Sequence, residues 1–156
     1  MTKKILVPID SIEHDYTFNA VREAINLASS REKDVELILL HLEYVETDLP
    51  KPERKRLVKA KEKEMKKEFD IIKEECRKRG LSDIETVVRE GKPDEEIVEV
   101  AGEEGVDLIV MGSGRLHNGS VKGRVKRFLY GSTTEEVVHE TPCSILIARP
   151  SETGEG

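Results

Sequence analysis

The chain has 156 residues, of which 37% are hydrophobic and 37% charged, and its formal net charge is −6. This length suits one domain with a sizeable core, so we expect a single domain over residues 1–150 and a disordered tail over residues 151–156. An acidic chain lacks the broad positive potential of a surface built for nucleic acid, and nucleic acid is therefore not the expected partner.

Targeting signals and cysteine spacing bear on the compartment. The first apolar run is short and is interrupted by Pro8, and no later run approaches the roughly 20 apolar residues of a membrane span. We therefore expect a cytoplasmic protein with no membrane partner. Cys76 and Cys143 have no C-x-x-C spacing, so they are expected to be free, mostly buried thiols rather than a zinc or redox pair.

The first half of the chain alternates between strand and helix patterns. A continuous apolar run predicts a buried strand over Lys4–Asp10, and apolar residues at helical spacing predict a helix over Tyr16–Ser29. Four consecutive apolar residues mark the clearest strand, Asp34–Leu42. The segment Glu53–Arg79 predicts one long amphipathic helix that ends at Gly80 and has a solvated charged face. Its predicted apolar stripe consists of Val58, Met65, Phe69, Ile72 and Cys76.

The second half continues this alternation. The predicted strands are Ile84–Glu90, Val106–Gly112 and Ser144–Ala148. They are separated by a helix within residues 91–105, with Pro93 at its start and Gly105 past its end, and by a helix over Ser132–Thr141. Strands separated by helices predict an α/β fold, an open five-stranded parallel sheet with helices on both faces. Ligands of such sheets bind beyond the carboxyl ends of the strands, so the candidates are Asp10, Leu42 and the loop after Met111.

That loop, within the stretch Met111–Thr133, is rich in glycine and basic residues. Its glycines do not follow the P-loop order, and they match the dinucleotide fingerprint G-x-G-x-x-G only at Gly112 and Gly114. Ser132 and Glu135 predict a capping box, and a helix start of this kind favours an anion. The loop is basic with no acidic residue, a local charge suited to phosphate, through Arg115, Lys122, Arg124, Lys126 and Arg127.

Several segments together resemble the universal stress protein family. They are "KKILVPID", "VELILLHL", "GKPDEEIVEVAGEEGVDLIVMGS" and "LYGSTTEEVVHETPCSILIARP", which cover nearly the whole chain. The resemblance implies an adenine-nucleotide alpha-hydrolase-like, Rossmann-like fold. It also implies a homodimer formed through the last strand, Ser144–Ala148, and ATP as the cofactor, with Mg²⁺ as its ion.

ATP-binding members of this family carry the pattern G-2x-G-9x-G-[ST]. Gly112 matches its first glycine, and Gly131 with Ser132 matches its last pair, but the interval is six residues longer than the pattern. Arg115 stands where the second glycine belongs when counted from the first, and Val121 when counted back from the last. Gly114, Gly119 and Gly123 remain alternatives for that glycine.

The resemblance assigns residues to the two ends of a nucleotide. The adenosine end is implied to be Pro8, Ile9, Asp10 and Leu42, with Asp10 near the ribose or a metal and Leu42 against the base. The phosphate end is implied to be Met111, Gly112, Gly131, Ser132 and Thr133, with Gly114 and Arg115 in the loop between them.

Two functions from different classes remain open. The first is an ATP-binding regulatory protein of the stress response that acts as a dimeric switch on an unknown protein partner. The alternative is a family member that binds no nucleotide and serves as a dimeric interaction module, which the lengthened loop favours.

An enzyme and a nucleic-acid-binding protein are less favoured. No residue stands out as a base that orients water, so at most slow ATP hydrolysis is expected. The histidines form no catalytic motif and are predicted to have surface or capping roles; they are His14, His41, His117 and His139. RNA or DNA binding through Arg115–Arg127 is disfavoured by the aromatic content of 4%.

Overall fold

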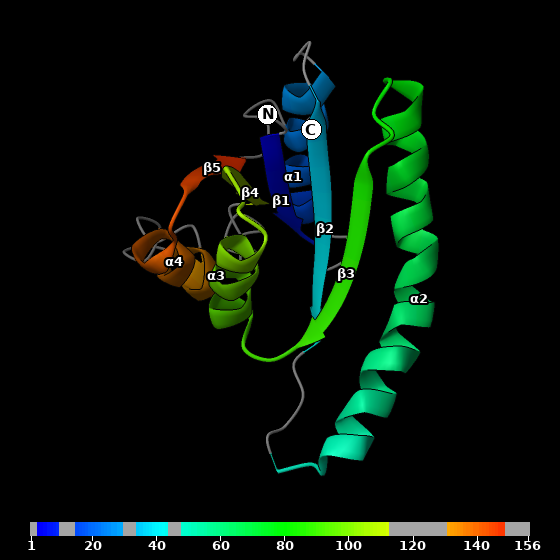
Figure 1. The fold of residues 1–156 in the computed structure, drawn as a ribbon, viewed down its shortest axis with the longest axis vertical. Coiled ribbons are helices and arrows are strands. Elements are labelled where there is room, and N and C mark those ends of the chain that lie inside the picture. Colours follow the sequence, from blue (N-terminus) through cyan, green and yellow to red (C-terminus); the bar gives the residue numbers. More distant parts are fainter. Residues whose placement is uncertain (1–2, 10–14, 30–33, 44–47, 113–130, 149–156) are drawn as a thin grey trace.

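The computed structural model describes residues 3–9, 15–29, 34–43, 48–112 and 131–148, which form strands and helices in alternation. The elements are β1 (Lys3–Pro8), α1 (Asp15–Ser29), β2 (Val35–Glu43), α2 (Lys51–Lys78), β3 (Ile84–Glu90), α3 (Pro93–Glu103), β4 (Leu108–Gly112), α4 (Gly131–Glu140) and β5 (Ser144–Ala148). The strands are parallel, in the order β3-β2-β1-β4-β5 (Figure 1). The predicted open, five-stranded parallel sheet is confirmed.

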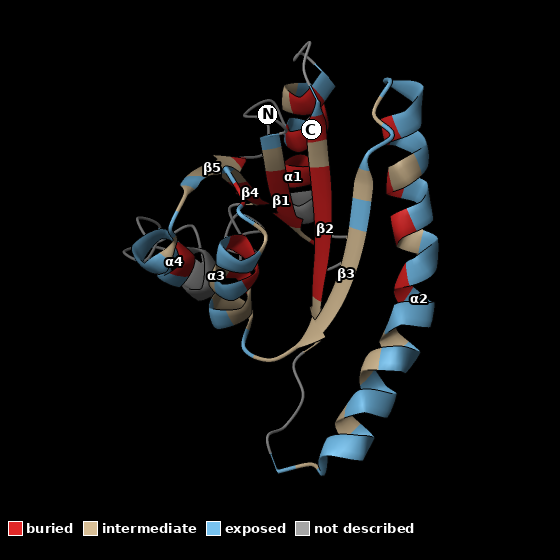
Figure 2. Ribbon diagram, in the orientation of Figure 1, coloured by how far each residue is buried: buried red, intermediate tan, exposed pale blue. Residues whose placement is uncertain are grey.

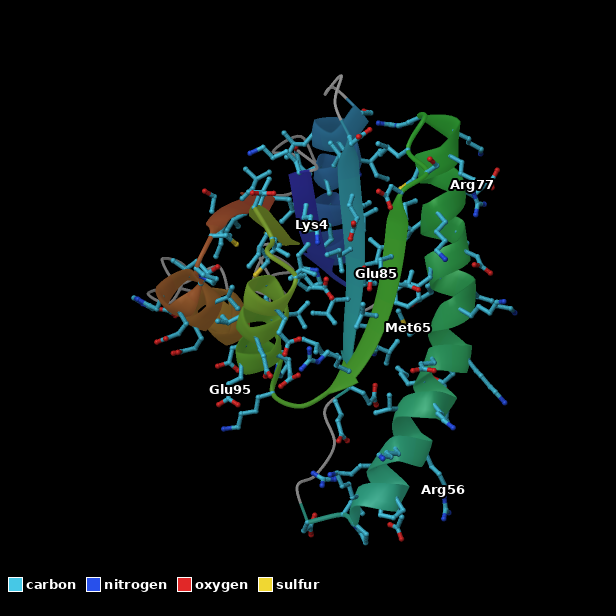
Figure 3. All side chains as sticks on the ribbon, in the orientation of Figure 1. Lys4, Arg56, Met65, Arg77, Glu85 and Glu95 are labelled. Atoms are coloured by element: carbon cyan, nitrogen blue, oxygen red, sulfur yellow. The ribbon has the colours of Figure 1, made fainter. Side chains whose placement is uncertain are left out.

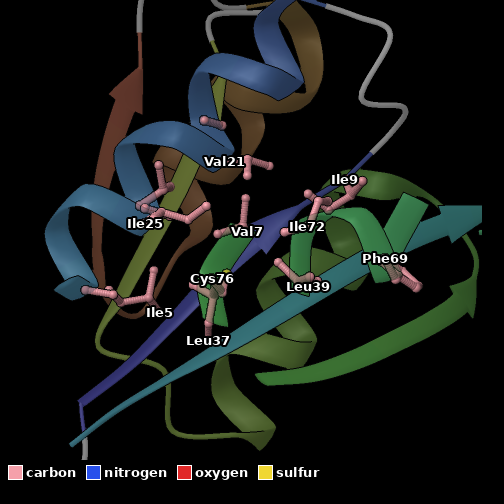
Figure 4. Packing of buried hydrophobic residues seen from close by; sticks show 14 of the residues in the cluster. Ile5, Val7, Ile9, Val21, Ile25, Leu37, Leu39, Phe69, Ile72 and Cys76 are labelled. Carbon is pink, nitrogen blue, oxygen red and sulfur yellow. The ribbon is translucent and has the colours of Figure 1, made fainter. Parts of the chain in front are cut away.

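Each face of the sheet has its own hydrophobic core, because successive side chains of a strand point to opposite faces. In β2, Leu37 and Leu39 lie in a cluster with residues of α1 and α2 (Figure 4). Ile38 and Leu40 lie in a second cluster, with residues of α3 and α4. We call these sides of the sheet the α1/α2 face and the α3/α4 face. Burial on both faces explains why the strand sequences are continuous apolar runs.

The long helix α2 has two unlike halves. The buried residues of its C-terminal half are Met65, Phe69, Ile72 and Cys76. Its N-terminal half continues beyond the ends of β2 and β3 and is largely exposed (Figures 1 and 2). Arg56 is one of the charged side chains that it carries (Figure 3), and Val58, predicted for the apolar stripe, is half-buried. Within the described parts of the chain, no helix combines the length and apolar character needed to cross a membrane.

Several element ends differ from the prediction by two residues. β1 ends at Pro8, and β4 begins only at Leu108. α2 begins at Lys51 with Pro52 in its first turn, because first-turn amides have no acceptor within the helix and proline loses nothing there. Gly80, the predicted stop of α2, has a φ of 83°, a left-handed conformation that glycine adopts without strain.

Candidate functional site

The strand order reverses at β1. This strand leads through α1 to β2 on one side, and its neighbour on the other side is β4. Ile5–Leu6 of β1 pair with Leu108–Ile109 of β4, and both strands continue beyond these pairs, β4 as far as Gly112. The carboxyl ends of β1, β2 and β4 therefore lie next to one another at the topological switch point, where open α/β sheets bind their ligands.

The predicted adenosine-end residues divide between the two faces of the sheet. Leu42 packs against the core of the α3/α4 face, and the alternation of β1 places Pro8 on that face with Leu6. Ile9 is 2% exposed and belongs to the core of the α1/α2 face. Its amide donates a hydrogen bond of 2.7 Å to the carbonyl of Leu40. Ile9 therefore anchors the end of β1 to β2.

The predicted phosphate-end residues lie at the end of β4 and the start of α4. Met111 is buried in the core of the α3/α4 face, and Gly112 is the last residue of β4. Because α4 begins at Gly131, Ser132 and Thr133 lie in its first turn, whose amides have no acceptor within the helix. The predicted helix began at Ser132, one residue after the observed start of α4 at Gly131.

Three of the predicted contacts fall outside the described residues. They are Asp10, Gly114 and Arg115, together with the other basic residues of the loop over 113–130. Their roles stay predictions. Within the described residues, no three His, Cys, Asp or Glu side chains are grouped so that they could hold a metal ion.

The structure adds one residue to this region, His41 of β2, which is buried at 3% exposure. Its Nδ1 lies 2.7 Å from the carbonyl oxygen of Ile9, and its Nε2 lies 3.3 Å from Oε2 of Glu43. The prediction of a surface or capping role is therefore wrong for His41, whereas His139 is exposed on α4 as predicted. The sequence contains a signal for the burial of His41, though not for its partners, since His41 continues the alternation of Leu37 and Leu39 on the α1/α2 face.

The Ile9 carbonyl determines which nitrogen of the His41 ring carries a hydrogen toward it. A carbonyl oxygen can only accept, so Nδ1 carries a hydrogen and donates it to Ile9. The Glu43 carboxylate also lies 3.8 Å from Nζ of Lys61 on α2. Burial lowers the pKa of Lys61, but the neighbouring Glu64, Glu43 and Glu68 raise it above its usual value. A polar chain therefore runs from the end of β1 through His41 and Glu43 to α2.

An ion-pair cluster attaches α3 to the edge strand β3 on the opposite face. Arg89 Nε lies 2.9 Å from Glu96, its Nη1 2.9 Å from Glu103, and its Nη2 3.6 Å from Glu99. Burial lowers the pKa of Arg89, but the three carboxylates raise it above its usual value. Burial also raises the pKa of Glu96, although Arg89 lowers it. The cluster positions α3 beside β3, the strand in which Arg89 is the register partner of Leu42.

Comparison with known families and curated proteins gives a consistent result. The profile of the Universal stress protein family matches residues 1–149. A universal stress protein of Methanothermobacter thermautotrophicus is 36% identical, covering 96% of this chain and 97% of the relative. Universal stress protein MJ0577 of Methanocaldococcus jannaschii is 29% identical, covering 96% of each.

Solved structures show the same Rossmann-like architecture. The structure of MJ0577 matches with a TM-score of 0.74 at 30% identity, covering 96% of this chain and 97% of the other. A universal stress protein in complex with cAMP matches with a TM-score of 0.59 at 22% identity, covering 94% and 95%. A family protein from Arabidopsis thaliana with AMP bound matches with a TM-score of 0.64 at 18% identity, covering 99% and 95%.

Proposed function

This chain belongs to the universal stress protein family, and we propose that it is a stress-response regulator that binds ATP with Mg²⁺ at the switch point and acts as a dimeric switch. One observation carries the proposal: the carboxyl ends of β1, β2 and β4 lie side by side, with apolar Leu42 and Met111 on one face. An apolar wall beside the strand ends suits a flat base. Proteins of the same fold in complex with cAMP and with AMP support the ligand class.

The first turn of α4 supports an anion at the other end of the site. It contains no acidic residue, whereas the first turn of α2 has Glu53 and that of α3 has Asp94, Glu95 and Glu96. The positive end of a helix dipole and its free amides attract phosphate when no carboxylate competes. Gly131, Ser132 and Thr133 would thus hold the phosphates, and Leu42 would contact the base. The bound Mg²⁺ would neutralise part of the phosphate charge.

The direct test is nucleotide binding by the purified chain. Protein extracted with acid is examined for nucleotide by mass spectrometry, and nucleotide-free protein is titrated calorimetrically with ATP, AMP and cAMP, with and without Mg²⁺. We expect ATP binding, and a melting temperature that rises with ATP concentration. Absence of co-purified nucleotide, together with no binding at millimolar ATP, would overturn the proposal.

Matched variants test the placement of the two ends. Gly131→Val and Ser132→Ala should each weaken ATP binding by about tenfold or more, which corresponds to a loss of roughly 1.4 kcal/mol in binding free energy. Leu42→Ala should weaken the binding of ATP, AMP and cAMP alike, because all three carry the same adenine base. Leu108→Ala is the control, since it makes the same change at the opposite end of the sheet. Equal losses in Leu42→Ala and Leu108→Ala would show that the base is placed wrongly.

The proposed dimer would use β5, which is an edge strand of the sheet. Its Ile145, Leu146 and Ile147 are only partly buried, and an unpaired edge of this kind is a template for pairing with a second chain. Sedimentation should give a dimer, and Ile147→Lys should give a monomer. A monomeric wild-type chain would contradict the switch.

The alternative function, a dimeric interaction module that binds no nucleotide, is favoured by the same edge strand and by the lengthened loop. Under this alternative the chain is a dimer and ATP changes neither its melting temperature nor its sedimentation. The two functions are therefore separated by the titration rather than by the dimer.

A further inference from the structure

His41 is a polar side chain that the proposed contacts to nucleotide do not use. It is 3% exposed, and its ring lies on the α1/α2 face, opposite the face on which Leu42 packs. Leaving a buried imidazole without partners costs stability, so a buried histidine requires hydrogen bonds. Its partners are the carbonyl of Ile9 and the carboxylate of Glu43, at 2.7 and 3.3 Å.

These contacts fix the end of β1 to β2 at two successive points. The amide of Ile9 donates to the carbonyl of Leu40, and the carbonyl of Ile9 accepts from Nδ1 of His41. Both backbone polar groups of Ile9 are therefore held by consecutive residues of β2. Ile9 lies one residue beyond β1, so its bond with His41 continues the connection between the strands past the regular pairing.

We propose that His41 is a positioning residue for the nucleotide site: through Nδ1 it sets the spacing between the ends of β1 and β2, which flank the adenosine. His41 does not touch the nucleotide. Its effect is carried by the Ile9 carbonyl on one side and by Leu42, the next residue of β2, on the other. This inference rests on the proposed function, because it concerns the geometry of that same site.

Two substitutions separate the two ring nitrogens. The side-chain amide nitrogen of asparagine lies close to the place of Nδ1, and that of glutamine lies close to the place of Nε2. His41→Asn can therefore still donate to Ile9 while it loses the contact with Glu43. His41→Gln keeps a polar group near Glu43 and leaves the carbonyl of Ile9 without its donor.

The experiment measures ATP affinity by calorimetry and the free energy of unfolding in urea for the wild type, His41→Asn, His41→Gln and Glu43→Gln. We expect His41→Gln to weaken ATP binding by about tenfold, which is the lower end of the loss seen when a residue that orients a metal ligand is removed. His41→Asn should stay within about threefold of the wild type, even if both variants lose similar stability. Glu43→Gln, which leaves the bond to Ile9 intact, should also stay close to the wild type.

The outcomes distinguish this inference from the proposed function. If the wild type binds no nucleotide, the proposed function is lost and this inference with it. If the wild type binds ATP and fully folded His41→Gln binds equally well, the inference is wrong while the function stands. Affinity losses that follow the loss of stability in Asn and Gln alike would show a purely structural role, which also overturns it.

Discussion

The helices on the two faces of the sheet are attached to it by different interactions. On the α1/α2 face the helices pack through apolar side chains, among them Ile25, Phe69 and Ile72 (Figure 4). Among the described residues, the α3/α4 face has a smaller apolar core, and charged side chains at its rim attach α3, above all Arg89 with its three glutamates. On the face where Leu42 and Met111 lie, the Arg89 cluster thus supplements the apolar packing of one helix, α3.

The largest effect on stability is expected on the α1/α2 face. Phe69→Ala should lower the free energy of unfolding by about 3–5 kcal/mol, because it leaves a cavity between α2 and the sheet. Leu57→Ala is the control in the same helix, since Leu57 is 45% exposed, and it should change stability by less than about 0.5 kcal/mol. Urea unfolding followed by circular dichroism measures both, and equal losses would contradict the division of α2 into two halves.

The two cysteines lie on different faces of the sheet, so their rates of alkylation compare the burial of the two faces. Cys76 lies in the core of the α1/α2 face, and burial and the charge of Glu75 raise its pKa to about 11, despite Arg79. Cys143 packs at the α3/α4 face and is half-buried. At pH 8 an alkylating reagent should therefore modify Cys143 at least about tenfold faster, because the nucleophile is the thiolate. Mass spectrometry of peptides from native protein measures this, and faster labelling of Cys76 would refute it.

The Arg89 cluster should account for an intermediate effect. Arg89→Ala should cost about 1–2 kcal/mol at pH 7, because Glu96, 16% exposed, loses its partner. Below about pH 4.5 the loss should shrink, since a protonated carboxyl needs no cation. Arg77→Ala removes an exposed pair with Glu74 and is the control, expected to cost at most about 0.5 kcal/mol. A loss at pH 7 no larger than the control's would mean that charge does not hold α3.

The smallest effect concerns Glu85 on β3. Glu85 is exposed, so only slight burial of its carboxyl, together with the charges of Glu104 and Glu36, raises its pKa above its usual value, although Lys4 lowers it. An acid whose pKa is raised on folding destabilises the native state when ionised and has no effect once both states are protonated. Glu85→Gln should therefore be more stable than the wild type by about 0.5 kcal/mol at pH 7.

This gain should disappear as the pH falls below about 4.5, and it should shrink in 1 M salt, which screens like charges. Thermal unfolding of both proteins across this pH range measures the difference. A gain that persists unchanged at pH 4 would point to a cause other than charge.

Much of the fold could be predicted because it depends on local pattern. The apolar run of β2 and the stripe of Met65, Phe69 and Ile72 on α2 give the periods of a buried strand and an amphipathic helix directly. The errors lie at element ends, such as the start of α2 at Lys51, where capping and first-turn proline allow more than one solution.

The candidate site could be predicted only in outline. The rule that ligands bind at the carboxyl ends of parallel strands selected Asp10, Leu42 and the loop after Met111 as candidates, and these roles stay predictions. The role of His41 could not be foreseen, because a histidine in an apolar run has no local partner in the sequence. Its acceptor is the carbonyl of Ile9, thirty-two residues away in the chain.

The sequence by itself determined the alternation of strands and helices and the parallel sheet, because these follow from hydrophobic period and chain connectivity; the ligand site that it places at the strand ends stays a prediction. Only the tertiary structure decided that Ile9 anchors a strand end, that His41 is buried against it, and that Arg89 gathers three glutamates of α3. The physical reason is that hydrogen bonds and ion pairs between distant segments depend on strand order and register. Strand order and register are fixed only when the two hydrophobic cores pack against the sheet.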